Sequence, residues 1–194
     1  MIHVYTAKKK RINIKQDSFP TRTKKTYSNN RKNDVLPIKS LLVLYSYHHK
    51  NTEKVAKTFA KVFDAQIKTP HQTNPEELQE YDLVGFGAGI DSGKHYKVLL
   101  NFVDKLLPVN KKNAFIFSTA AITGEEKLAE DHSTLKEKLE SKGYRIVDEF
   151  QCKGFNTNSF LRFFGGMNKG RPNADDLKDA EDFALSLKKN LQKK

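Results

Sequence analysis

The segment Ser40–Phe63 constrains the fold of this chain more than any other, because it joins two patterns of different period. Residues Leu41 to Tyr45 form an unbroken apolar run, which is typical of a parallel strand covered on both faces. After Asn51, apolar side chains recur at helical spacing as far as Phe63, with lysines on the opposite face. The polar stretch between them would place unpaired backbone N–H groups at the positive end of a helix. The sequence therefore predicts a βα unit whose loop can bind a phosphate group.

Strands and helices alternate along the rest of the chain. Apolar runs predict strands at Ser40–Ser46, Asp64–Thr69, Asp82–Gly87, Asn113–Ser118 and Tyr144–Gln151. Helical spacing predicts helices at Asn51–Phe63, Lys94–Leu106, Glu126–Lys142 and Asn173–Lys189, with a single turn at Glu76–Glu80. This alternation predicts an α/β fold with a doubly wound, five-stranded parallel sheet of strand order 2-1-3-4-5. A ligand of such a sheet binds in the loops after strands 1, 3 and 4.

The charge of the chain is concentrated near its start. Residues 1–39 hold eleven Lys or Arg and only two acidic residues, out of a net charge of +12 for all 194 residues. We therefore expect residues 1–38 to be a basic, disordered extension, capable at most of weak nucleic-acid contact, and residues 39–192 to form one domain. No apolar run approaches the length of a membrane span. The single cysteine, Cys152, favours a reducing compartment, which we interpret as the cytoplasm.

The first loop excludes two common phosphate-binding motifs, since it contains neither GxxxxGK[ST] nor GxGxxG. It resembles instead the loop of the flavodoxin family, in which [ST]-x-[ST]-x-G-N-T wraps the phosphate of FMN. Ser46, Asn51 and Thr52 fit this pattern, whereas Lys50 replaces the glycine and His48 and His49 replace hydroxyl residues. The block YSYHHKNTEKVA looks closest to a branch of stand-alone flavodoxin-like proteins with a His-His pair. The resemblance covers Lys39 to about Leu191.

The loops after the third and fourth strands extend this resemblance. The first of them, Gly87–Tyr96, holds three glycines within seven residues, which would let its backbone approach a flat ligand. Because the chain has no Trp, Ile90 and Tyr96 are the side chains available to cover a flavin ring. The flavodoxin resemblance implies FMN contacts at Ser46, Tyr47, His48, His49, Lys50, Asn51, Thr52, Gly87, Ala88, Gly89, Ile90, Asp91, Lys94, His95, Ser118, Thr119 and Ala120.

Less specific interpretations compete at several of these positions. Adjacent histidines on a surface loop can cap it without touching any ligand, and no third residue nearby has metal-ligand spacing. Phe160, Phe163 and Phe164 fit the core better than a flavin edge, and Cys152 fits a buried small hydrophobe better than a nucleophile.

The resemblance implies an FMN-binding protein that passes electrons between redox partner proteins or to a small redox substrate. Two alternatives remain open at this point. One is a small flavin-dependent reductase or oxidase of the quinone or porphyrinogen type. The other is a flavin-free binding module on the same fold.

Overall fold

The computed structural model describes residues 37–158 and 163–193. The basic extension that we expect at residues 1–38 falls almost entirely outside these ranges, and so does any nucleic-acid contact assigned to it. Phe160 also lies outside the described residues. Among the helices of the described part, none is long and apolar enough to cross a bilayer.

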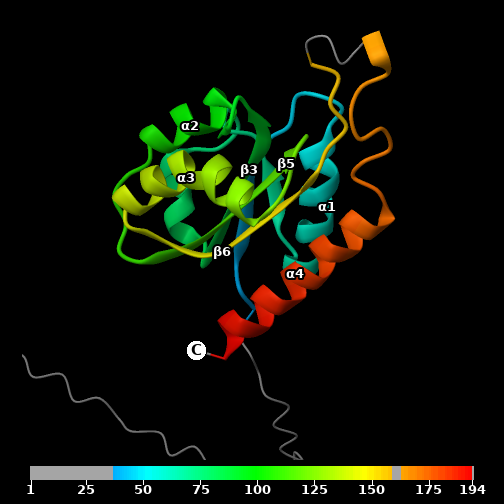
Figure 1. Ribbon diagram of the computed structural model, residues 1–194. Coiled ribbons are helices and arrows are strands. Elements are labelled where there is room, and N and C mark those ends of the chain that lie inside the picture. The colour runs from blue at the N-terminus through cyan, green and yellow to red at the C-terminus, as the bar shows by residue number, and fades with distance from the viewer. Residues whose placement is uncertain (1–36, 159–162, 194) are drawn as a thin grey trace, which may run out of the picture. The chain divides into compact units, whose positions relative to one another are not determined.

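The described residues form an α/β domain with a parallel sheet (Figure 1). Its main path is β2-β1-β3-β5-β6, all parallel, while the short strand β4 pairs antiparallel with β3. This arrangement confirms the predicted sheet and its order, with β5 and β6 as the fourth and fifth parallel strands. The strands are β1 (Ser40–Tyr45), β2 (Gln66–Lys68), β3 (Leu83–Asp91), β4 (Lys94–His95), β5 (Lys112–Ala120) and β6 (Tyr144–Lys153).

Within the described residues, four α-helices cover the two faces of the sheet. They are α1 (Asn51–Phe63), α2 (Lys97–Asp104), α3 (Glu125–Ser141) and α4 (Ala174–Gln192), and a 3-10 turn spans Pro75–Glu80. Helices α1 and α4 lie side by side on one face, and α2 and α3 on the other (Figure 1). The predicted turn at Glu76–Glu80 is present, and Gly143, with a φ of 86°, follows the end of α3.

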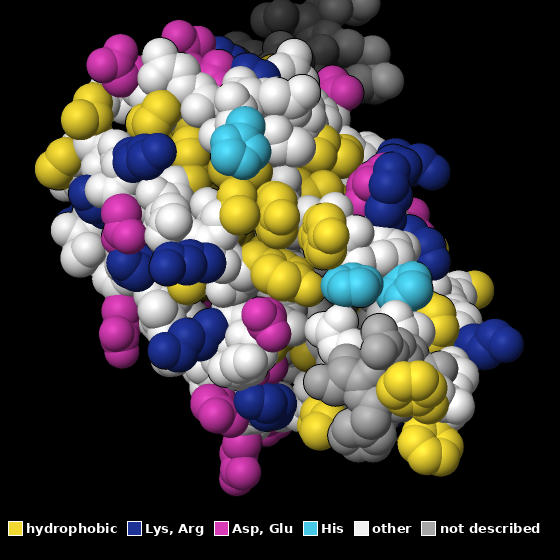
Figure 2. Space-filling model, turned by 90° about the horizontal axis from the view of Figure 1, so that it is seen from above, with side chains coloured by type: hydrophobic (Ala, Val, Ile, Leu, Met, Phe, Trp, Pro, Cys, Tyr) yellow, Lys and Arg dark blue, Asp and Glu magenta, His cyan; other side chains and the backbone are white. Residues whose placement is uncertain are grey.

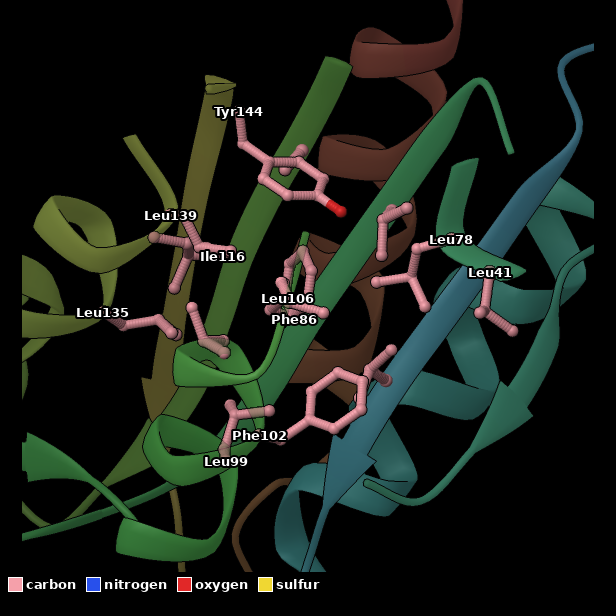
Figure 3. Packing of buried hydrophobic residues seen from close by; sticks show 14 of the residues in the cluster. Leu41, Leu78, Phe86, Leu99, Phe102, Leu106, Ile116, Leu135, Leu139 and Tyr144 are labelled. Atoms are coloured by element: carbon pink, nitrogen blue, oxygen red, sulfur yellow. The ribbon is translucent and has the colours of Figure 1, made fainter. Parts of the chain in front are cut away.

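The strand side chains alternate between two cores, as the period of a strand requires. Under α2 and α3, Leu41, Phe86 and Ile116 pack against helix side chains such as Leu99 and Leu135 (Figure 3). On the opposite face, Leu42, Leu44, Phe115 and Phe117 pack against α1 and α4. Burial of this apolar surface on both faces fixes the sheet, and it thereby fixes where the loops at the carboxyl ends of the strands emerge.

The segment after β3 differs from the prediction. The expected helix at Lys94–Leu106 begins only at Lys97, because Lys94 and His95 pair with the end of β3 as a β-hairpin. Ser92 and Gly93 form its two-residue loop with φ values of 52° and 77°, the combination that a type I′ turn requires. The glycine-rich stretch therefore continues β3 instead of forming a free loop.

Candidate functional site

A cleft opens at the carboxyl ends of β1, β3 and β5, and the loop after β6 forms its remaining wall. The cleft is open, and the space of about 400 Å³ between its walls includes open solvent. Its wall is formed by Ser46, Tyr47, His48, Asn51, Thr52, Gly89, Ile90, Tyr96, Thr119, Ala120, Ala121, Gly154, Phe155, Asn156 and Asn158. The cleft lies where the chain switches direction across the sheet, since β2 and β3 flank β1 on opposite sides.

The loop before α1 is built on strained backbone. His49 and Lys50 both have left-handed conformations, with φ values of 50° and 52°. Lys50 thus occupies the position where the flavodoxin pattern has glycine, and that position does require a positive φ. Its ammonium group lies 3.7 Å from the carboxylate of Glu53, and its side chain is 73% exposed. Lys50 therefore faces α1 and solvent, and it is not part of the cleft wall.

The start of α1 opens toward the cleft. Lys50, the N-cap residue, makes no side-chain hydrogen bond to the helix, and the hydroxyl of Ser46 accepts one from the backbone N–H of Glu53 at 3.2 Å. A helix start carries partial positive charge and favours an anion. Because Ser46 lines the cleft, its O–H also remains available as a donor to a ligand.

Asn51 and Thr52 are both buried and connect the loop to distant parts of the chain. The Thr52 hydroxyl lies 2.9 Å from that of Thr119 in β5, and the Asn51 amide donates to the carbonyl of Phe155 at 2.8 Å. The remaining amide oxygen of Asn51 is buried and has no hydrogen-bond partner among the described residues. Since Asn51 lines the cleft, a hydroxyl donor of a ligand would satisfy this oxygen.

On the β3 side, the cleft is apolar. Ile90 and Tyr96, the two side chains predicted as possible ring covers, both line it. The Tyr96 ring lies over Gly89, where a Cβ would approach it to 2.9 Å, and its edge packs against Tyr45 at a centroid distance of 5.6 Å. Burial raises the pKa of Tyr96, so its hydroxyl stays protonated at neutral pH. This side therefore provides a flat, uncharged wall.

Several other predicted residues do not line the cleft. Gly87 and Ala88 belong to the core: a Cβ on Gly87 would lie 2.1 Å from the Phe117 ring, and Ala88 is fully buried. Asp91 and Lys94 flank the hairpin turn. His95 and Ser118 are buried and do not reach the cleft wall.

The loop after β6 forms a wall that sequence reasoning left without a role. The His49 ring packs against Phe155 in a tilted arrangement at a centroid distance of 4.4 Å, and its Nε2 lies 2.8 Å from the hydroxyl of Thr157. The two histidines of the pair thus differ, because His48 lines the cleft whereas His49 contacts this loop. The backbone N–H of Gly154 donates to the carbonyl of Ala120 and anchors the start of the loop.

A polar network lies buried beside the cleft. Ser118 Oγ is 2.8 Å from Nε2 of His132, whose Nδ1 is 3.0 Å from the carboxylate of Glu149. Hydrogen bonds from His132 and Lys136 lower the pKa of Glu149 to about 2 against the opposing effect of burial, so this carboxylate accepts from Nδ1–H at neutral pH. The amide of Gln151 donates to Ser118 Oγ, so the network extends from β6 through Ser118 to His132.

His95 packs against this network without joining it. Its ring lies 4.8 Å from that of His132, and neither of its nitrogens has a hydrogen-bond partner of normal geometry among the described residues. Burial, together with the neighbouring His132, lowers the pKa of His95 to about 3. His95 is therefore a neutral core histidine that holds the β3–β4 hairpin against α3.

Two further expectations can be compared with the structure. Cys152 is buried, and burial raises the pKa of its thiol to about 12, as expected of a small core residue. Phe163 and Phe164 are 74% and 81% exposed, so their expected place in the core is wrong.

The fold is that of an open, doubly wound α/β protein, a class whose ligands bind in a crevice at the carboxyl ends of the strands. Within this class, residues 42–188 match the family model described as the flavodoxin domain. The chain therefore belongs to the flavodoxin family, as its first loop predicted. Its assignment to a branch with a His-His pair remains a prediction.

The chain is also similar to individual proteins. An uncharacterised protein from Methanocaldococcus jannaschii is 47% identical over 153 residues, which are 79% of this chain and all of the relative. Among solved structures, a flavodoxin from the domain Archaea has a TM-score of 0.59 at 16% identity, covering 80% of this chain and 99% of its own. Oxidised Flavodoxin 2 from Bacillus cereus has a TM-score of 0.60 at 17% identity, covering 78% and 99%. At these identities the two structures are similar to this chain in fold alone.

Proposed function

We propose that this protein binds FMN in the cleft and transfers electrons between redox partners. The observation that carries the proposal is the composition of the cleft wall, which combines the start of α1 with an apolar side. Ser46, Thr52 and His48 gather at the helix start, while Ile90 and Tyr96 lie on the apolar side. A ligand with a phosphate at one end and a flat apolar ring at the other fits both.

The residues present fit FMN on two further observations. The orphaned amide oxygen of Asn51 is an acceptor for a hydroxyl, which the ribityl chain of FMN offers in number. Because Gly89 has no side chain, the Tyr96 ring lies directly against β3, and the space next to the ring remains part of the cleft. Bound FMN would supply one- and two-electron chemistry at its ring. The protein would bind and orient it through the groups named above.

Identification of the released cofactor tests the proposal directly. Denaturing the purified protein should release FMN in a ratio near one per chain, identified by chromatography against FMN, FAD and riboflavin. Purified protein that neither carries nor takes up any flavin would support the flavin-free binding module instead.

The proposed position of the phosphate is tested by comparing the affinities of FMN and riboflavin and by substituting two serines one at a time. Charge-assisted hydrogen bonds contribute about 1.5–3 kcal/mol each, so riboflavin should bind about 10- to 100-fold more weakly than FMN. Ser46→Ala should weaken FMN, whereas Ser92→Ala, at the hairpin turn outside the cleft wall, should not. Equal dissociation constants for FMN and riboflavin, measured by fluorescence quenching, would place the phosphate elsewhere.

A turnover assay distinguishes an electron carrier from an enzyme. We propose that the protein is an electron carrier and that it works in the cytoplasm. Because a carrier depends on a separate reductase, the FMN-loaded protein should oxidise NADH or NADPH with a quinone only when a reductase is added. Rapid turnover without a reductase would identify a flavin-dependent oxidoreductase.

A further inference from the structure

Exposed apolar side chains gather around the mouth of the cleft. In the described residues, Tyr47, Ile122, Phe163, Phe164 and Met167 are 69%, 63%, 74%, 81% and 37% exposed. They come from the loops after β1, β5 and β6, which all emerge at the same end of the sheet. Figure 2 looks down on this end and shows hydrophobic and histidine side chains side by side on it. We call these five residues the mouth surface.

This concentration is unusual for a surface that meets only water. Single exposed apolar side chains are common, but several of them on the loops around one cleft mark a site of interaction. Leu107 and Leu185 are the other large hydrophobic residues that are exposed in the described part of the chain, and neither lies in these loops. Aromatic residues and Met are also the types enriched at protein interfaces.

Charge next to the mouth surface indicates what kind of partner fits. Within 153–158 and 163–171, part of the connection from β6 to α4, stand Lys153, Lys169 and Arg171, and no acidic residue. Arg171 is paired with Asp176 at 2.6 Å. Lys153 and Lys169 are exposed and make no ion pair within the described residues, so their charge faces outward uncompensated.

We propose that the mouth surface docks a redox protein whose own contact face has an apolar centre and acidic residues on the side that meets Lys153 and Lys169. The proposal rests on the proposed function, since electrons would enter or leave at the cleft that the surface surrounds. Complementary charges of this kind steer the encounter and fix its orientation. The apolar side chains then exclude water from the contact.

A lipid surface fits these observations less well. Glu125 and Glu126 follow Ile122 at the start of α3 and are exposed next to the same loop. Their charge would be repelled by an anionic bilayer lying flat across the mouth, whereas a protein partner can place its acidic residues on the β6 side alone.

The test uses the full-length protein loaded with FMN and a small acidic ferredoxin as the probe. In each productive encounter, one electron passes from the reduced iron–sulfur cluster to the bound cofactor, so the cluster is oxidised as the cofactor is reduced. Stopped-flow absorbance at low ionic strength gives the second-order rate constant. The rate should fall steeply as salt is added, and a basic cytochrome c, reduced by the protein, should not show this dependence.

Two double variants probe the charge and the apolar part separately. Lys153→Glu with Lys169→Glu should slow the reaction with ferredoxin about tenfold at low salt and change it little at high salt. Phe163→Ser with Phe164→Ser should slow it about tenfold at both. Matched controls away from the mouth, Lys105→Glu with Lys189→Glu and Leu107→Ser with Leu185→Ser, should stay within about twofold of the parent protein.

The FMN content and dissociation constant of every variant are measured first. If the parent protein binds no FMN, the proposed function fails. If FMN binds normally but the mouth variants react like the controls, or if cytochrome c is preferred at low salt, only the docking proposal is overturned. Sedimentation with phosphatidylglycerol vesicles that is lost in the Phe163→Ser, Phe164→Ser variant would overturn it in favour of a membrane surface.

Discussion

Acidification should destabilise this domain through His95. Its imidazole is buried against His132, with Asp131 and Glu149 nearby on α3 and β6, and its pKa is about 3 in the folded chain. An unfolded histidine has a pKa near 6.5. Because the unfolded chain binds the proton more readily, acid favours unfolding. The contribution of His95 to the free energy of unfolding is fully present above pH 6.5 and is lost as the pH falls from 6.5 toward 3.

The size of the effect follows from these two pKa values. Between pH 7.5 and pH 5, His95 alone should lower the free energy of unfolding by about 2 kcal/mol, out of a total of about 5 kcal/mol at pH below 3. Glu149, with a pKa lowered to about 2, loses its stabilising effect only at lower pH and adds about 0.2 kcal/mol in this range. The interval from pH 7.5 to 5 therefore isolates the histidine from the carboxylates.

Urea unfolding of the flavin-free protein, followed by far-UV circular dichroism, measures this loss. His95→Leu removes the titrating group and forfeits no hydrogen bond of normal geometry, so it should reduce the loss between pH 7.5 and 5 by about 2 kcal/mol. His71→Gln is the matched control, because His71 is exposed and its removal should leave the pH dependence unchanged.

Two results would refute the argument. One is an equal loss of stability in the parent protein and in His95→Leu over this range. The other concerns the parent protein alone and applies even if the variant does not fold: an NMR titration in which the His95 ring protonates near pH 6 would show that it is not buried as described.

Urea unfolding at neutral pH tests three further features of the structure: the left-handed backbone at Lys50, the Thr52–Thr119 contact and the packing at Gly87. Lys50→Gly relieves a left-handed residue and should raise the free energy of unfolding by about 0.5–1 kcal/mol, whereas Lys50→Ala should bring no gain. Thr119→Val leaves the Thr52 hydroxyl buried without a partner and should cost about 1–3 kcal/mol; adding Thr52→Val should cost less than the sum of the two single changes. Gly87→Ala forces a methyl group into the Phe117 ring and should cost about 1–3 kcal/mol.

The fold could be predicted because its signals are local. The apolar run of β1 and the helical spacing of α1 lie within one short segment, and α1 has the bounds that its spacing predicts. The β3–β4 hairpin was missed because its strand residues are mostly glycine and small side chains, which carry no alternating pattern. Its real signal was the Ser92-Gly93 pair, which suits a type I′ turn.

The site was predictable only in part, because many of its contacts are not local. Ser46 and His48 follow a strand whose end can be read from sequence, and they line the cleft. Phe155 and Asn156 follow β6, and nothing in their own segment indicates that the chain there returns to the first loop. His95 looked like a loop residue beside the cofactor, yet hairpin pairing turns it into the core. Only tertiary structure decides between these outcomes.

The hydrogen bonds between the first loop and the loop after β6 affect the order in which the protein folds during synthesis. Asn51 bonds to Phe155 across 104 residues, and His49 to Thr157 across 108. On the ribosome, the first loop and α1 emerge early, but their partners are synthesised only after all of the sheet. Such distant contacts form late, since the intervening chain must be ordered first. The cleft is thus completed only after β6 has been synthesised, and a chain that stops before Gly154 would lack one of its walls.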